Sequence, residues 1–99
     1  MDMELLNEAQ KQLDKLGNLG ARVSFDFGDN GGIFIDAREK PAVIEILNDQ
    51  ESDCNISVKE EDFKKMMNGS LSPMMAFTLG KLKIKGSMGI AMKLSSLWD

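Results

Sequence analysis

Apolar positions at the start of the chain recur with helical spacing and then alternate with polar ones. The first stripe consists of Leu5, Leu6, Ala9, Leu13 and Leu16. Because these positions lie three or four residues apart, they predict a helix that Asp2 caps and that Gly17 and Gly20 end. From Arg22 the period changes to two, with Val23, Phe25 and Phe27 on one face. This alternation predicts a half-buried strand.

Three further strands follow the first one. The glycine-rich residues 28–32 tolerate positive φ and predict a hairpin turn into a strand at residues 33–35. A second turn leads to a strand at residues 43–47. Residues 54–58 then alternate apolar with polar side chains. The first 58 residues therefore predict one helix and four strands.

The rest of the chain predicts three helices and a fifth strand. One helix begins near Glu60, where acids precede lysines, and stops at Asn68. A short helix opens at Ser72, which precedes a proline at the first helical position, and ends at Gly80. Residues 81–85 alternate strictly and form the fifth strand. In the last helix, which Ser87 caps, one stripe consists of Ile90, Leu94, Leu97 and Trp98.

Length and missing residue types narrow the classes of function. A chain of 99 residues predicts a single domain over residues 1–99. The absence of histidine and tyrosine excludes Ser-His-Asp and Cys-His catalysis, and one cysteine without imidazole leaves no usual zinc site. A carboxylate-only enzyme stays open, but no motif supports it. We therefore expect a protein that is not an enzyme, with no catalytic residue, metal ligand or cofactor.

Two observations indicate a cytoplasmic protein. The longest uncharged stretch, residues 66–80, is too short and too polar to span a bilayer as a helix. The start of the chain lacks the pattern of a secretory signal, and a single cysteine, Cys54, suits a reducing compartment.

Charge is divided unevenly along the chain. Residues 1–62 carry 6 basic and 15 acidic side chains, whereas residues 63–98 carry 6 lysines and no acid. We expect Lys81, Lys83, Lys85 and Lys93 to attract lipid head groups or an anionic membrane. The alternative is an ordinary solvated face. No nucleic-acid partner is expected.

Methionine is concentrated in the second half of the chain. Six of the eight methionines lie within 27 residues, from Met66 to Met92. Unbranched thioethers adapt to varied shapes, so the concentration suits a pocket for flexible apolar ligands, although a methionine-rich core is an open alternative.

The segment from Gly80 to Leu94, GKLKIKGSMGIAMKL, closely resembles the C-terminal signature of the sterol carrier protein two family (SCP-2 sterol transfer family). Upstream, residues 53–58 and 69–77 occur in the order found in that family. The resemblance implies an α/β fold of the α+β type. Its five-stranded, mainly antiparallel sheet would be covered on one face by helices, with an apolar tunnel between them. The independent count of five strands agrees.

The resemblance implies non-catalytic binding or transfer of a fatty acid, fatty acyl-CoA, sterol or phospholipid. We expect the ligand to contact Phe63, Met67, Leu71, Met74, Met75, Phe77, Ile84, Met88, Met92, Leu97 and Trp98. Trp98 is also expected to close the cavity mouth, unless it only anchors the last helix. The alternative function is that of an accessory domain, which dimerises or docks on a lipid-metabolising or quinone-biosynthetic enzyme.

Overall fold

The fold of the chain is given by a computed structural model that describes residue 7, residues 19–39 and residues 42–98. Apart from Asn7, which is helical, the helix predicted before Gly17 lies outside the described residues. No helix in the described part of the chain has the length and apolar character needed to cross a membrane.

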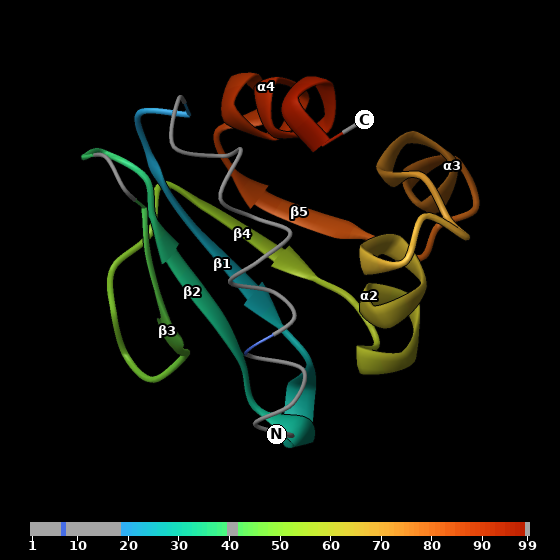
Figure 1. Ribbon diagram of the computed structural model, residues 1–99, viewed down its shortest axis with the longest axis horizontal. Coiled ribbons are helices and arrows are strands. Elements are labelled where there is room, and N and C mark those ends of the chain that lie inside the picture. Colours follow the sequence, from blue (N-terminus) through green and yellow to red (C-terminus); the bar gives the residue numbers. More distant parts are fainter. Residues whose placement is uncertain (1–6, 8–18, 40–41, 99) are drawn as a thin grey trace.

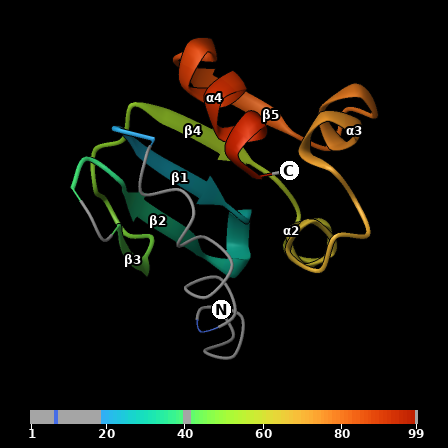
Figure 2. The same ribbon diagram turned by 45° about the horizontal axis from the view of Figure 1, so that its top comes forward.

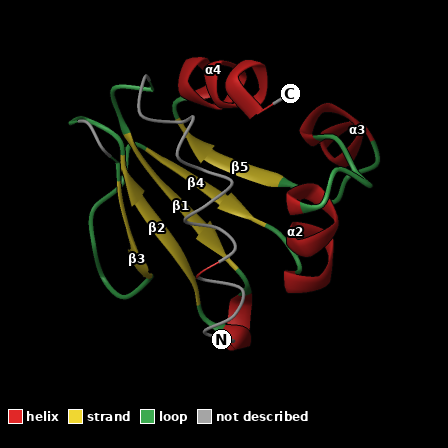
Figure 3. Ribbon diagram, in the orientation of Figure 1, coloured by secondary structure: helices red, strands yellow, loops and turns green. Residues whose placement is uncertain are grey.

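The five predicted strands form one sheet (Figures 1 and 3). They are β1 (Arg22–Asp26), β2 (Gly32–Asp36), β3 (Val43–Ile46), β4 (Cys54–Ser57) and β5 (Lys83–Gly86). Their order is β3-β2-β1-β4-β5, in which β1 pairs with β4 in parallel and every other pair is antiparallel. A 3₁₀ turn over Gly28–Asn30 completes the hairpin between β1 and β2. The mainly antiparallel sheet is thereby confirmed.

Three helices lie on one face of this sheet (Figures 1 and 2). They are α2 (Glu60–Met67), α3 (Pro73–Thr78) and α4 (Met88–Trp98). Ser72 caps α3 as predicted, because its Oγ accepts a hydrogen bond from the Met75 N–H at 3.1 Å. Lys59 occupies the cap position of α2 and supplies no such bond.

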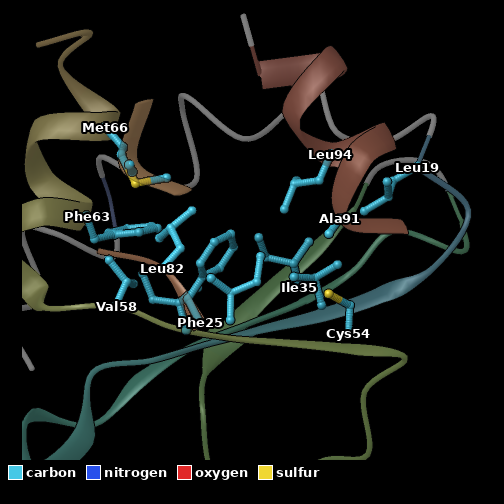
Figure 4. Close-up of a cluster of buried hydrophobic side chains, with 14 of the residues drawn as sticks. Leu19, Phe25, Ile35, Cys54, Val58, Phe63, Met66, Leu82, Ala91 and Leu94 are labelled. Atoms are coloured by element: carbon cyan, nitrogen blue, oxygen red, sulfur yellow. The ribbon is translucent and has the colours of Figure 1, made fainter. Parts of the chain in front are cut away.

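The core lies between the sheet and these helices. Phe25 is fully buried, and its ring lies 5.0 Å from that of Phe63 on α2. In Figure 4, Val58, Phe63 and Met66 lie at one end of the cluster, whereas Ala91 and Leu94 of α4 cover the other end. Alternation along β1 and β4 thus places their apolar side chains on the helix-covered face, as the sequence predicts, whereas Phe34 of β2 lies on the other face.

The opposite face of the sheet carries the buried Phe34 beside Ser24 and is held to the connection between β3 and β4. Ser24 is buried, and its Oγ lies 2.9 Å from the Ser52 Oγ and 3.0 Å from the Asn55 Oδ1. At the start of β1, the Arg22 N–H donates to the Asp53 Oδ2 at 2.9 Å, and the Asp53 N–H donates to the Arg22 carbonyl at the same distance. These bonds fix β4 in parallel beside β1.

Candidate functional site

The two helices nearest β5 expose a group of large apolar side chains. Met74, Met75 and Phe77 of α3, Leu79 at its end, and Met88 and Met92 of α4 are between 47% and 69% exposed. We call this group the α3–α4 surface. Only Pro73 and Ala76 of α3 are buried, and α3 contacts α4 directly. Large apolar surfaces exposed together are typical of binding sites.

Half-buried apolar residues on the same elements, or next to them, pack against the core. Leu71 before α3, Ile84 of β5 and Ile90 of α4 are partly buried and pack against the core cluster. Ile84 pairs with Ile56 of β4 on the helix-covered face. An apolar ligand on the α3–α4 surface would therefore adjoin further apolar side chains below it.

The predicted ligand residues are distributed over three levels of burial. Phe63 and Met67 are buried, Leu71 and Ile84 are half-buried, and five are exposed. The exposed ones are Met74, Met75, Phe77, Met88 and Met92. The side chains of Leu97 and Trp98 lie outside the description, although both residues belong to α4. Leu79, which is 58% exposed, was not among the predicted contact residues, although its position four residues after Met75 places it beside them.

The four predicted head-group lysines do not form one group. Lys83 and Lys85 pair with Ser57 and Asn55, on the sheet face opposite Ile84. The Lys81 Nζ lies 3.7 Å from the Asp62 Oδ1, and Lys93 is exposed on α4. The structure therefore separates Lys85 and Lys93 from the other two.

A polar pocket of about 400 Å³ brings Lys81 and Lys83 together with Lys59. It lies where β1 and β4 end, beside the start of α2. Its walls also include Asp26 and the buried Asp62, and its apolar part comes from Phe27 and Val58. Sequence reasoning did not predict this pocket, because its residues come from four separate segments of the chain.

Three titratable groups outside the pocket, Asp53, Asp36 and Cys54, have structural partners or are buried. The backbone N–H and the guanidinium of Arg22 lower the pKa of the Asp53 carboxyl. The side chain of Arg38 likewise lowers the pKa of Asp36, to which it bonds at 2.7 Å. Burial raises the pKa of the Cys54 thiol, which is fully covered and stays protonated at neutral pH.

An α+β sheet covered on one face by helices, with an exposed methionine-rich surface on two of them, defines a small binding domain. Residues 3–99 match the model of the SCP-2 sterol transfer family. The chain belongs to that family.

Individual relatives agree with this assignment. The chain is 33% identical to human sterol carrier protein 2 over 94% of its own length and 19% of that protein. It thus spans about a fifth of the length of this curated relative. The sterol carrier protein domain 2 of Helicoverpa armigera superposes with a TM-score of 0.70 at 30% identity, over 97% of this chain and 81% of that one.

A palmitated sterol carrier protein of Aedes aegypti shares the fold at 17% identity. Its TM-score is 0.72, over 97% of this chain and 89% of that one.

Proposed function

We propose that the protein binds lipid-like molecules without catalysing a reaction and carries or sequesters them in the cytoplasm. The observation that carries this proposal is the exposed α3–α4 surface, with half-buried Leu71, Ile84 and Ile90 packed against the core. The name of the human relative and the palmitated state of the mosquito protein support a lipid ligand.

The ligand chain would lie against the α3–α4 surface and reach toward Leu71 and Ile84. Each buried methylene group contributes about 0.8 kcal/mol. A sixteen-carbon chain therefore has a gross gain on the order of 10 kcal/mol, before the costs of ordering and association are subtracted. We expect micromolar affinity, which corresponds to a net binding free energy of about 8 kcal/mol. In this proposal the tunnel expected from the family opens beside α3 and α4.

Native mass spectrometry tests the proposal directly. The protein, as expressed and after addition of palmitate, should carry one lipid per chain. A chain that stays free of lipid at every palmitate concentration would contradict the proposal. A lipid-free homodimer, or a stable complex with an enzyme, would instead support the accessory-domain function.

Matched variants locate the ligand on the surface. Met75→Gln and Met92→Gln remove apolar contact at positions that are 52% and 69% exposed, so the pair should weaken palmitate binding about tenfold without lowering stability. Glu45→Gln is the control, because it places the same side chain at an exposed position of β3, at the edge of the sheet opposite β5. If the wild-type protein, the double variant and the control bind palmitate with equal affinity, this surface is not the ligand site.

A further inference from the structure

The polar pocket beside α2 holds more positive than negative charge. Three lysines, Lys59, Lys81 and Lys83, line it against two aspartates, Asp26 and Asp62. Both aspartates already have partners, since Asp62 pairs with Lys81 and the Asp26 Oδ1 accepts the Gly28 N–H at 2.8 Å. Within residues 19–39 and 42–98, Lys59 and Lys83 have no ion-pair partner.

The walls of the pocket strengthen its interaction with an anion. Phe27 and Val58, which line it, are only 6% exposed and belong to the core. Apolar walls lower the local dielectric constant, so an ammonium group interacts more strongly with an anion there than on an open surface. A neighbouring pocket has two glutamates, Glu60 and Glu61, and two lysines, and its balanced charge gives an anion no such preference.

The pocket adjoins both the core and the α3–α4 surface. The Phe27 ring lies 5.1 Å from the ring of Phe63, one of the residues predicted to contact the ligand. Gly80 and Lys81 directly follow α3, and the Lys81 N–H donates to the Ala76 carbonyl of that helix at 2.8 Å. Lys83 enters the pocket from the sheet face opposite Ile84, so an amphiphile bound to α3 would reach the pocket by passing the start of β5, which is an edge strand.

We propose that the pocket binds the anionic head group, a carboxylate or a phosphate, of the lipid that the protein carries, through Lys59 and Lys83. Lys81 stays paired with Asp62, so only part of its positive charge acts on the head group. This inference rests on the proposed function and adds a head-group site to it, so anionic single-chain lipids should bind better than neutral lipids of the same chain.

The test compares three ligands with the same alkyl chain length: palmitate, cetyl phosphate and cetyl alcohol. Each displaces Nile red, a neutral apolar dye, from the wild-type protein and from Lys59→Gln, Lys83→Gln and Lys85→Gln. The first two variants should need about fivefold more palmitate and cetyl phosphate for half displacement, with cetyl alcohol unaffected. Lys85→Gln is the matched control, because Lys85 lies on the same strand and face as Lys83 but outside the pocket.

The outcomes separate the two proposals. Equal displacement by each lipid in every variant, or an effect of Lys85→Gln as large as that of Lys83→Gln, would overturn the head-group site and leave lipid binding intact. No displacement by any of the three lipids would contradict the proposed function itself. Inorganic phosphate should compete only weakly with cetyl phosphate, and strong competition would show a site for free anions in place of a head-group site.

Discussion

Gly86 is the residue whose identity the backbone restricts most clearly. It connects β5 to α4 with φ of +99°, a conformation that L side chains rarely adopt. A Cβ placed there would lie 2.5 Å from the Asp53 carbonyl oxygen, which also accepts the Ser87 N–H at 3.1 Å. The close approach fixes the start of α4 against the start of β4, and so positions the helix that carries Met88 and Met92.

Replacing this glycine should cost more than replacing one in open space. Gly86→Ala combines a positive-φ cost of roughly 1–2 kcal/mol with a backbone clash that adds about 1–3 kcal/mol. Gly80 has a similar φ of +75°, but a Cβ there meets no atom within 4 Å. Gly80→Ala should therefore lose only the roughly 1–2 kcal/mol that the positive φ costs. Urea denaturation of both variants measures the difference in unfolding free energy. Equal losses would mean that the junction relaxes freely.

Sequence reasoning named most of the apolar residues of the α3–α4 surface but could not rank their burial. Met66 and Met67 are buried, whereas Met74 and Met75 are exposed, although both are adjacent pairs in short helices. The difference arises because α2 packs on Phe25 and Phe27 through Phe63, while α3 is six residues long and is held mainly through Pro73 and Ala76. The spacing of apolar residues along the chain does not reveal such long-range packing.

At the scale of elements, the alternation predicted all five strands, and the errors lie at their ends. The fifth strand begins at Lys83 and not at Lys81, because the Lys81 N–H closes the end of α3 by donating to the Ala76 carbonyl. Leu82 still points inward and is 8% exposed, as the alternation predicts. The Lys81 N–H could either close the end of α3 or pair with a neighbouring strand. The sequence alone does not show which of these two hydrogen bonds forms.

The start of α2 gives a second prediction at this scale. Lys59 has the extended backbone of a cap residue but makes no capping bond, so Lys59→Ser should stabilise the protein by about 0.5–1 kcal/mol. The same change should weaken palmitate binding about fivefold, if Lys59 holds the head group. Ser72→Ala calibrates the scale, because removing the existing cap of α3 should cost about 1 kcal/mol. Thermal unfolding and Nile red displacement give the two readouts. A stabilised protein with full palmitate affinity would show that Lys59 has no part in binding.

At the scale of the whole molecule, the parallel pairing of β1 with β4 is the feature that strand patterns do not contain. The strand order brings residues 31 positions apart together in the Arg22–Asp53 pair. It also places the basic β5 at one edge of the sheet and β3, which exposes Val43 and Ile46, at the other. The polar pocket follows from the same topology, since only the parallel pair makes β1 and β4 end at the same side.

The final prediction concerns α4 as a cover for the bound lipid. Trp98 is the sole tryptophan and the last residue of α4, a helix that contacts α3, β4 and β5. A lipid chain bound beside this helix would exclude water from its end, so palmitate should shift the Trp98 emission to the blue. Trp98→Ala should then weaken binding, mainly because the ligand leaves faster, as stopped-flow dilution would measure. If Trp98 only anchors α4, the variant instead loses thermal stability without ligand, and the emission of the wild-type protein is the same with and without palmitate. That second pattern would show that the end of α4 does not cover the ligand, and the α3–α4 surface alone would bind the lipid.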